Sequence, residues 1–404
     1  MQFGLLGGKL GHSYSPQIHS YLGEYPYALY EVEPQNIELF MKSKDFTGIN
    51  VTIPYKKTVL PYCASLSNMA LKLGAVNTII RNDQGNLIGH NTDYFGFMYM
   101  VRKSGLQVLG KKVLVLGSGG ASNTAVAVMQ ELGANVIVIS RSGKNNYENI
   151  QLHNDAAAIV NATPVGMYPN NGVSPIDLSF FPQLEGVLDM IYNPSKTKLM
   201  LDAEERGLVA ENGLWMLIAQ AKESAEWFTG KRYDDRIIEQ IYRALSTEMK
   251  NIVLVGMPGC GKSSVGQALA KELNRSFFDA DQEIINAAGC SIADIFEKSG
   301  EKGFRQMETA ILKKLGKNSC SVISTGGGCV TREENFPLLR QNGIIIWIQR
   351  DIKLLATDGR PLSNATKLHD MYTVREPMYR RFADHIVTNN GSIQETIEQI
   401  RRLL

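Results

Sequence analysis

The chain has few of the features expected of a secreted, membrane-spanning or zinc-binding protein. Its 404 residues include only five cysteines, and no two of them form a C-x-x-C pair. An odd, scattered set of thiols argues against a disulfide framework and favours reduced thiols in a cytoplasmic protein. No apolar run reaches the length needed to span a bilayer. The N-terminal stretch MQFGLLGGKLGHS lacks the basic and apolar regions of a signal peptide, so we expect none.

The sequence also lacks a strong charge of either sign. Its 42 Lys and Arg residues nearly balance its 40 Asp and Glu residues, which leaves a formal charge of +2. We therefore expect small-molecule partners, and neither nucleic acid nor a membrane, while a homo-oligomer stays open. The chain has no internal repeat and no low-complexity segment, and its length suggests two or three domains.

Short apolar runs alternate with helical patterns along most of the chain. The runs with strand character include VLVLG, NVIVIS, GVLDMIY, NIVLVG, CSVIST and GIIIWIQ. The segments between them include the helical patterns ASNTAVAVMQELG and SVGQALAKELN. This alternation predicts an α/β fold with mostly parallel sheets. A helical stretch ends near Ser246 and a strand begins near Asn251, so we expect a short join, TEMK, between two parts.

A glycine turn follows the apolar run KKVLVL. Residues 117–122 read GSGGAS, and a helical pattern comes next. Glycines here permit a tight turn and a close backbone approach to a pyrophosphate, and the helix N-terminus adds partial positive charge. The motif is shorter than G-x-G-x-x-G, so a tight turn without a ligand stays an alternative. The residues expected to bind the dinucleotide are Gly117, Ser118, Gly119, Gly120 and Ala121.

The next predicted strand ends in Ser140, Arg141 and Ser142. An acidic residue at this point would bind a ribose 2′-hydroxyl and favour NAD, whereas arginine accommodates a 2′-phosphate. We therefore expect NADP(H), although an exposed arginine is also unremarkable at the end of a strand.

Polar clusters lie upstream, each at the end of an apolar run where a strand would deliver side chains to a cleft. They are GHSYSP, GINVTIPYK, GAVNT and GHNTD. Taken singly, each has a simpler interpretation. Lys56 could be a solvated surface lysine, Thr92 or Asp93 could cap a helix, and Ser15 could do the same before Pro16.

In combination these stretches closely resemble shikimate dehydrogenase over about residues 1–245. The motifs, in family order, are S-x-S-P, N-V-T-x-P-x-K, G-A-V-N-T, N-T-D, G-x-G-G-A, N-A-T-P-x-G-M at 161–167 and G-x-x-M-L-x-x-Q at 213–220. The resemblance implies a substrate domain at 1–100, completed by helices at about 214–245, and a Rossmann domain at 101–213.

The resemblance also implies roles for individual residues. Ser13 and Ser15 would bind the substrate carboxylate, and Lys56 and Asp93 would form the catalytic pair. The residues around the ring hydroxyls would be Asn50, Thr52, Asn77, Asp93 and Gln220, with Tyr192 near the same pocket and with Met190 and Gly213 beside the nicotinamide. Hydride reduction of a ketone leaves a developing alkoxide, which a lysine ammonium can stabilise and protonate.

Two features depart from the family pattern. Asn145 stands where the family often has a second arginine, and the segment from Arg141 to Asn161 is short for a helix plus a strand. We therefore expect a weaker grip on the 2′-phosphate.

A second nucleotide loop, GMPGCGKSS, begins at Gly256 after the run NIVLVG. The spacing G-x-x-x-x-G-K-[ST] is that of a P-loop, whose backbone N–H groups cradle nucleotide phosphates. Lys262 would reach the β- and γ-phosphates of ATP, and the Ser263 hydroxyl would ligate Mg²⁺. The other loop residues expected to contact the nucleotide are Gly259, Cys260, Gly261 and Ser264.

Further polar clusters follow this loop, namely FFDADQEI, GEKGFRQME, ISTGGG, GRPL and REPMY. A turn, a loose glycine hairpin and solvated arginines are the simpler interpretations. The ordered set resembles shikimate kinase over about residues 249–404.

By this second resemblance, Asp281 hydrogen-bonds the acceptor hydroxyl and takes its proton, and Asp279 helps to hold Mg²⁺ through water. Arg305 and Arg375 would grip the carboxylate, because the planar guanidinium suits it. The remaining assignments are a backbone N–H from Gly327 to the ring and a lid contact from Arg360 to the ATP phosphates. Only fourteen residues separate Arg360 from Arg375, which is short for the lid and helix of the family.

Together the two parts predict consecutive reactions on one chain, within the synthesis of aromatic amino-acid precursors. The first is NADPH-dependent reduction of 3-dehydroshikimate to shikimate, and the second is its phosphorylation by ATP to shikimate 3-phosphate. One alternative is a catabolic quinate/shikimate dehydrogenase that uses NAD, against which Arg141 argues. The other is a shikimate sensor with inactive domains. The presence of Lys56, Asp93, Lys262 and Asp281 argues against it.

Overall fold

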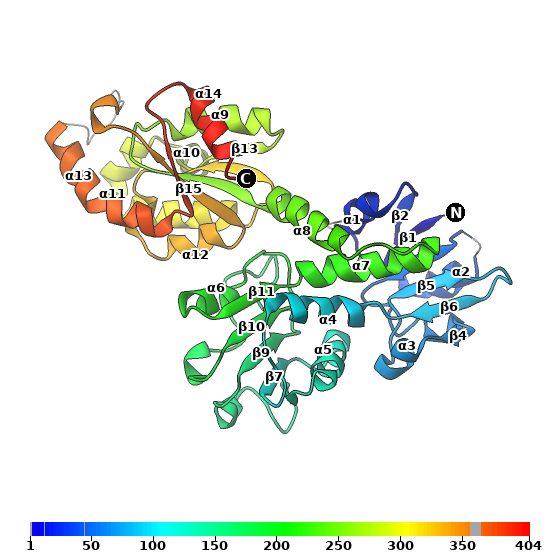
Figure 1. Cartoon of the computed structure of the whole chain (residues 1–404). Coiled ribbons are helices and arrows are strands. Elements are labelled where there is room, and N and C mark those ends of the chain that lie inside the picture. Colours follow the sequence, from blue (N-terminus) through cyan, green and yellow to red (C-terminus); the bar gives the residue numbers. More distant parts are fainter. Residues whose placement is uncertain (1, 12, 44, 356–364) are drawn as a thin grey trace. The chain divides into compact units, whose positions relative to one another are not determined.

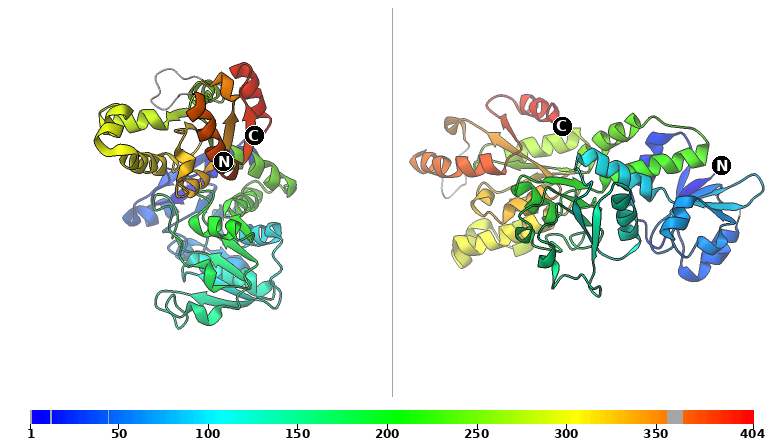
Figure 2. Two further views of the ribbon diagram at one scale, coloured as in Figure 1. Left: turned by 90° about the vertical axis from the view of Figure 1, so that its left-hand side faces the viewer. Right: turned by 60° about the horizontal axis from the view of Figure 1, so that its bottom comes forward.

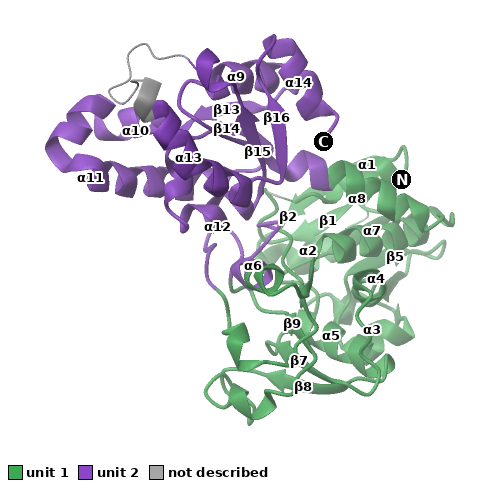
Figure 3. Ribbon diagram, turned by 60° about the vertical axis from the view of Figure 1, so that its left-hand side comes forward, with its two compact units in different colours: residues 1–165, 174–192, 202–245 green, residues 166–173, 193–201, 246–404 purple. Residues whose placement is uncertain are grey.

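The computed structural model describes residues 2–11, 13–43, 45–355 and 365–404. The chain forms two compact units, coloured green and purple in Figure 3. Unit 1 comprises residues 1–165, 174–192 and 202–245, and unit 2 comprises residues 166–173, 193–201 and 246–404. The proposed division into domains at 1–100, 101–213 and 249–404 stays a prediction.

The first sheet of unit 1 has six strands in the order β2-β1-β3-β5-β6-β4. The strands are β1 (Phe3–Gly7), β2 (Tyr27–Glu31), β3 (Gly48–Val51), β4 (Ser65–Leu66), β5 (Thr78–Arg81) and β6 (Leu87–His90). β1 pairs in parallel with β2 and β3, whereas β5 pairs antiparallel with β3 and β6. The helices between these strands are α1 (Ser15–Leu22), α2 (Ile37–Lys42) and α3 (Asn68–Leu73).

The second sheet of unit 1 is parallel throughout, in the order β11-β10-β9-β7-β8. Its strands are β7 (Lys112–Leu116), β8 (Asn135–Ile139), β9 (Ala158–Asn161), β10 (Gly186–Asp189) and β11 (Val209–Asn212). Helix α5 (Gly120–Glu131) joins β7 to β8. Between β8 and β9 there is only a 3₁₀ turn, η3 (Ile150–His153), where a longer segment would hold a helix.

Helices α4 (Asp93–Ser104) and α7 (Leu214–Thr229) pack along each other in unit 1, as Figure 1 shows. They are connected to the two sheets, because α4 follows β6 of the first sheet and α7 follows β11 of the second. Each helix therefore begins at the carboxyl end of a strand, α4 at the first sheet and α7 at the second.

Unit 2 contains a five-stranded parallel sheet in the order β13-β14-β12-β15-β16. Its strands are β12 (Asn251–Val255), β13 (Ser276–Asp279), β14 (Ser321–Ser324), β15 (Gly343–Gln349) and β16 (His385–Thr388). The helices around it are α9 (Lys262–Glu272), α10 (Ala280–Ala288), α11 (Ile292–Leu315), α12 (Asn335–Arg340), α13 (Ala365–Phe382) and α14 (Ile393–Arg401). Helix α14 packs against α9 (Figure 2), and α11 is kinked at Gly300.

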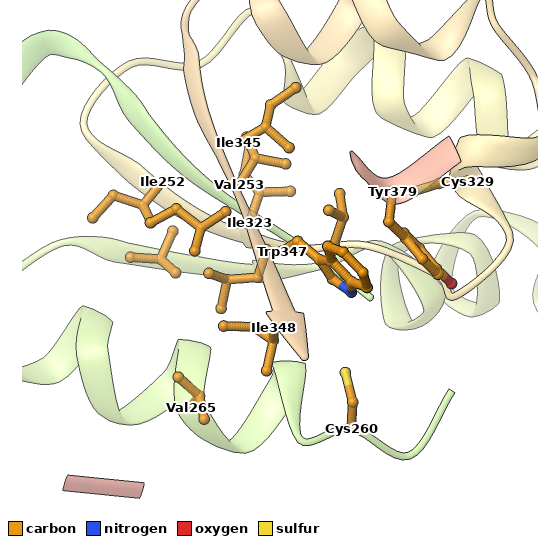
Figure 4. Packing of buried hydrophobic residues seen from close by; sticks show 14 of the residues in the cluster. Ile252, Val253, Cys260, Val265, Ile323, Cys329, Ile345, Trp347, Ile348 and Tyr379 are labelled. Carbon is orange, nitrogen blue, oxygen red and sulfur yellow. The ribbon is translucent and has the colours of Figure 1, made fainter. Parts of the chain in front are cut away.

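The inner strands of both parallel sheets are continuous apolar runs because helices cover both faces of such a sheet. In unit 2, Val253, Ile323, Ile345 and Trp347 are at most 1% exposed and pack into one cluster (Figure 4). The predicted α/β class with mostly parallel sheets is confirmed. None of the helices in the described part of the chain combines the length and the apolar character that a membrane crossing needs.

Helix α8 (Arg236–Met249) extends beyond its predicted end near Ser246. Nothing in Thr247–Glu248–Met249 breaks a helix, and the Met249 side chain is buried, so packing continues the helix. Only Lys250 separates α8 from β12, and the expected TEMK join is mostly helical.

Candidate active sites

The glycine turn after β7 is open at the place where a phosphate would approach. Gly117 has φ +108°, a conformation that favours glycine, and its N–H donates to the Ile139 carbonyl at 2.8 Å. A Cβ on Gly119 or Gly120 would meet no atom within 4 Å. The Ser122 hydroxyl donates to the Gly117 carbonyl at 2.7 Å and holds the turn. Because α5 begins at Gly120, the turn fits the dinucleotide pyrophosphate.

Arg141 lies just past the end of β8, the strand that pairs with β7. Arg141 and Ser142 are exposed, and the N–H of Ser140 donates to the Asn145 carbonyl at 3.1 Å, which closes a short loop. Adjacent parallel strands end at the same edge of a sheet, so the arginine and the glycine turn share that edge. This arrangement suits an arginine that contacts a 2′-phosphate.

Lys56 and Asp93 form an ion pair, with Lys56 Nζ 2.6 Å from Asp93 Oδ2. The lysine side chain is 31% exposed and the aspartate side chain 13%, so the pair faces a partly solvated space. Lys56 lies in the loop after β3, whereas Asp93 is the first residue of α4, where the helix dipole stabilises a carboxylate. The surface-lysine interpretation of Lys56 is therefore wrong.

Thr92 is the N-cap residue of α4, but its side chain makes no capping hydrogen bond. The Thr92 hydroxyl lies 3.0 Å from Asn77 Nδ2 and 3.0 Å from the Ser224 hydroxyl. The Thr92 hydroxyl thus bonds residues from other elements and does not cap the helix, so the capping interpretation of Thr92 is wrong. The capping interpretation of Ser15 is also wrong, because Ser15 is the first residue of α1 and Tyr14 is its N-cap.

Asn50, Asn77 and Gln220 come together from β3, from the segment before β5 and from α7. Asn50 Nδ2 donates to the Asn77 carbonyl at 3.3 Å, and Asn77 Nδ2 lies 3.5 Å from Gln220 Oε1. Both asparagines are at most 5% exposed. The structure thus brings together three of the residues predicted to surround the ring hydroxyls.

The serine pair lies beside Asn50 through Tyr27. The Ser15 N–H donates to Ser13 Oγ at 3.2 Å, and the Tyr27 hydroxyl donates to Asn50 Oδ1 at 2.8 Å. Burial raises the pKa of Tyr27, and a hydrogen bond with Ser15 partly offsets that effect. Tyr27 therefore stays a neutral donor. It links Ser15, a predicted contact of the substrate carboxylate, to Asn50, a predicted contact of the ring hydroxyls. Sequence analysis missed it because no motif contains it.

The remaining predicted residues of this site lie near these groups or near the cofactor turn. Thr52 follows β3, and its N–H donates to the Leu6 carbonyl at 2.9 Å. The Tyr192 ring meets the Tyr14 ring edge to face at 6.1 Å, next to the serine pair. A Cβ on Gly213 would lie 2.2 Å from the Met190 carbonyl oxygen, so the close approach of these two segments requires glycine.

In unit 2, the P-loop after β12 holds its lysine in place. Lys262 Nζ donates to the carbonyls of Gly256 and Met257, each at 3.0 Å, and the lysine is buried. Gly259 and Gly261 have φ of +83° and +96°, which glycine adopts without strain. The ammonium therefore lies within the loop that would surround the phosphates. Buried Cys260 and exposed Ser264 flank this lysine and its neighbour Ser263.

Ser263 and Asp279 meet beside the P-loop. The Ser263 hydroxyl donates to Asp279 Oδ2 at 2.5 Å, and Asp279 Oδ1 accepts from the N–H of Asp281 at 3.0 Å. The interpretation of Asp279 as a turn residue is thus right for its Oδ1, which accepts from a backbone N–H. Its Oδ2 instead accepts from the Ser263 hydroxyl. A hydroxyl and a carboxylate are hard oxygen ligands of the kind that Mg²⁺ prefers, with phosphates and water completing its shell.

The glycine segment after β14 lies against two carboxylates and an arginine. A Cβ on Gly326 would lie 2.4 Å from Glu308 Oε1 and 2.9 Å from Asp281 Oδ1. A Cβ on Gly328 would lie 2.1 Å from an Arg305 nitrogen. The absence of side chains at 326–328 therefore leaves room for these charged groups.

Arg375 reaches the same segment from α13. Its guanidinium donates to the Gly327 carbonyl at 3.1 Å, and the Tyr379 hydroxyl donates to the same oxygen. The loose-hairpin interpretation of ISTGGG is therefore wrong, because side chains from another helix hold the segment. Arg360 lies outside the described residues.

Two family models match the chain, the shikimate dehydrogenase substrate binding domain at residues 5–79 and shikimate kinase at residues 258–404. The shikimate dehydrogenase (NADP(+)) of Clostridium perfringens strain 13 is 34% identical over 265 residues, covering 60% of this chain and 97% of the relative. The chain belongs to the shikimate dehydrogenase family. Together with the kinase match, this identifies a bifunctional enzyme of the shikimate pathway, as the sequence predicted.

Solved structures support the family assignment. A crystal structure of shikimate dehydrogenase 1 from Peptoclostridium difficile is 36% identical, with a TM-score of 0.57, and covers 61% of this chain and 98% of its own. A quinate dehydrogenase from Corynebacterium glutamicum in complex with NAD is 26% identical, with a TM-score of 0.55, and covers 60% of this chain and 99% of its own.

Within the shikimate kinase domain, Glu308 is a charged residue that the motif analysis passed over. Its carboxylate accepts from Arg305 at 2.7 Å and is fully buried, whereas Glu301, the other acidic partner of Arg305, is 65% exposed and lies at 3.3 Å. Burial raises the pKa of Glu308, and the negative charge of Asp281 adds to the effect. An acidic residue three positions after Arg305 on a helix was the signal that could have revealed it.

We predict that Glu308→Ala lowers the free energy of unfolding of the kinase domain by about 3 kcal/mol, because it leaves Arg305 without its buried partner. The matched variant Glu301→Ala should cost less than about 1 kcal/mol, because an exposed ion pair contributes little. Urea unfolding followed by kinase activity measures both. Equal losses for the two variants would contradict the assignment of Glu308 as the main anchor of Arg305.

Proposed function

We propose that unit 1 reduces 3-dehydroshikimate to shikimate with NADPH and that unit 2 phosphorylates shikimate at its O3 with ATP and Mg²⁺. The observation that carries the first half is the 2.6 Å ion pair between Lys56 and Asp93, beside buried amides that can bind hydroxyl groups. The observation that carries the second half is the convergence of Lys262, Asp281 and Arg305 around the P-loop and the glycine segment.

In the dehydrogenase half, NADPH supplies the hydride when it is bound. The Lys56 ammonium stabilises the alkoxide that develops on the ketone oxygen and donates its proton to it. Asp93 accepts a hydrogen bond from Lys56 and so orients the ammonium toward the substrate. The serine hydroxyls of Ser13 and Ser15 bind the carboxylate and fix the ring relative to the lysine.

In the kinase half, Asp281 accepts the proton of the attacking hydroxyl. Arg305 and Arg375 bind the ring carboxylate from opposite elements, α11 and α13. Lys262 places positive charge inside the P-loop, and Ser263 with Asp279 would hold Mg²⁺. Positioning and charge neutralisation then account for transfer, which needs no covalent intermediate with the protein.

The cytoplasm is the proposed location of both reactions. All five cysteines are free thiols, two of them buried, which supports a reducing compartment. The product of the first reaction is the acceptor of the second, so the two halves act in sequence on one carboxylated ring.

We predict that Lys56→Ala abolishes reduction and leaves the phosphorylation of shikimate nearly unchanged, because Lys56 and Lys262 belong to separate compact units and independent sites do not couple. The adjacent variant Lys57→Ala is the matched control, since Lys57 is exposed and should retain full activity in both assays. Lys262→Ala should remove only the kinase activity. Loss of both activities in a folded Lys56→Ala protein would overturn the proposal of two separate sites.

We predict that NADPH is used in preference to NADH and that Arg141→Ala reduces this preference, mainly through the KM for NADPH. A charged hydrogen bond contributes about 1.5–3 kcal/mol, and because Asn145 replaces a second arginine the lower end is expected, roughly tenfold. The KM for NADH serves as the internal control, because NADH has no 2′-phosphate. Equal use of both cofactors by the unmodified enzyme would favour the NAD-dependent quinate/shikimate alternative.

A further inference from the structure

Ser224 of α7 lies at the centre of the polar residues of the dehydrogenase site, although no motif contains it. Its side chain is completely buried. Four groups lie within hydrogen-bond distance of its hydroxyl: Asn50 Nδ2 at 2.8 Å, Thr78 Oγ1 at 2.8 Å, Thr92 Oγ1 at 3.0 Å and the Gln220 carbonyl at 2.9 Å. The first and last of these belong to residues that we place around the substrate ring.

A hydroxyl has one proton and two lone pairs, so it can donate one hydrogen bond and accept two. Ser224 therefore cannot bond all four groups fully at the same time. The Asn50 amide N–H only donates, so it occupies one lone pair of Ser224. The Gln220 carbonyl only accepts, so it takes the Ser224 proton when that bond forms. The hydroxyls of Thr78 and Thr92 then compete for the other lone pair of Ser224, and Asn77 Oδ1, 3.2 Å from each of them, is their alternative acceptor.

These contacts, together with backbone groups, fix the orientation of both asparagine amides. Asn50 Oδ1 accepts from Tyr27 at 2.8 Å, while its Nδ2 donates to Ser224 at 2.8 Å and to the Asn77 carbonyl at 3.3 Å. A carbonyl only accepts, so a flipped Asn50 amide would lose that bond. Asn77 Oδ1 accepts from the N–H of Thr92 at 2.7 Å while its Nδ2 donates to Thr92 Oγ1 at 3.0 Å. Ser224 reaches the second bond through the Thr92 hydroxyl, whose oxygen lies 3.0 Å from both Ser224 Oγ and Asn77 Nδ2.

Each amide keeps one group for a ligand. Asn50 Oδ1 has a second lone pair, and the second N–H of Asn77 has only a 3.5 Å contact with Gln220 Oε1. One amide can therefore accept from a ring hydroxyl and the other can donate to one.

We propose that Ser224 is a positioning residue of the dehydrogenase site, which orients Asn50 and Asn77 so that they distinguish ring hydroxyls. The inference rests on the proposed function and adds the residue that sets its hydroxyl specificity. A site whose buried polar groups are fixed for a substrate hydroxyl rejects an analogue that lacks this hydroxyl, because those groups are left unpaired. Loosening the amides should weaken that rejection.

A helical serine often bonds the carbonyl four residues earlier, so a purely structural role must be separated from this one. Thr229 supplies the matched control on the same helix. Its hydroxyl donates to the Ala225 carbonyl at 2.8 Å, as Ser224 does to the Gln220 carbonyl. Beyond the helix it contacts the Lys231 N–H and the Tyr233 hydroxyl, which are not substrate residues.

The test compares Ser224→Ala and Thr229→Val in the full chain, with NADP⁺ and two substrates. One substrate is shikimate, and the other is an analogue without its C4 hydroxyl, with the C5-deoxy analogue as a second probe. We expect Ser224→Ala to lower kcat/KM for shikimate about tenfold, the upper range for one neutral hydrogen bond, mainly through KM. For at least one deoxy analogue kcat/KM should change less than twofold. The ratio of kcat/KM for shikimate to kcat/KM for that analogue should therefore fall about fivefold or more.

This ratio does not depend on how much of the variant folds, since the same active molecules turn over both substrates. Thr229→Val should leave it unchanged, and the KM for NADP⁺ and the kinase activity should not respond to Ser224→Ala. An Asn77→Ala/Ser224→Ala double variant should lose less than the product of the single losses, because Ser224 acts through Asn77.

Unchanged ratios for Ser224→Ala with both analogues, or a ratio shift in Thr229→Val of the same size, would overturn the inference. Failure of the proposed function would look different, because the unmodified protein would then not oxidise shikimate at all. Losses that multiply fully in the double variant would also contradict a role for Ser224 through Asn77.

Discussion

Both nucleotide-binding turns follow a strand at which the connectivity of a parallel sheet reverses. β7 lies between β8 and β9, and β12 lies between β14 and β15. The chain therefore builds the sheet first on one side of β7 or β12 and then crosses to the other side. This leaves a crevice at the carboxyl ends of the strands, which is where open α/β sheets bind ligands. Gly117 and Gly256 begin the two turns there. Arg141 and Gly326 follow the strands next to β7 and β12, and Asp279 ends β13, one strand further out. The chemistry of each half depends on this topology.

Each half also pairs its central cation with a carboxylate before any substrate binds. Lys56 pairs with Asp93 in a partly exposed setting, and Arg305 pairs with the buried Glu308. The cost of desolvating and orienting these charges is met during folding, so little reorganisation is left for the reaction itself. The two pairs differ in purpose. In the proposed mechanism the first pair exchanges a proton with the substrate, whereas the second holds an arginine that binds a carboxylate without reacting.

Motifs predicted the parts of the site that depend on local chemistry. Glycines with positive φ, the P-loop lysine and the arginine after β8 can be identified from a few neighbouring residues, and so can the three apolar strands around each turn. Of the residues that sequence analysis missed, Ser224 and Tyr27 act over long distances in the chain, whereas Glu308 lies only three positions from Arg305. Ser224 contacts Asn50 across 174 positions, and Tyr27 and Glu308 lie outside the substrate-contact motifs or are hidden within them. Thr92 has a typical capping position, yet buried donors compete for its hydroxyl and win, because an unsatisfied buried group costs more than an uncapped helix.

The most direct test of two consecutive reactions on this chain is product analysis with 3-dehydroshikimate, NADPH, ATP and Mg²⁺, omitting one reagent at a time. The account predicts shikimate 3-phosphate from the complete mixture, shikimate alone when ATP is omitted, and no product when NADPH is omitted. Added shikimate should restore the phosphate ester without NADPH. Accumulation of shikimate in the complete mixture, or consumption of 3-dehydroshikimate without a reduced nicotinamide, would contradict the account.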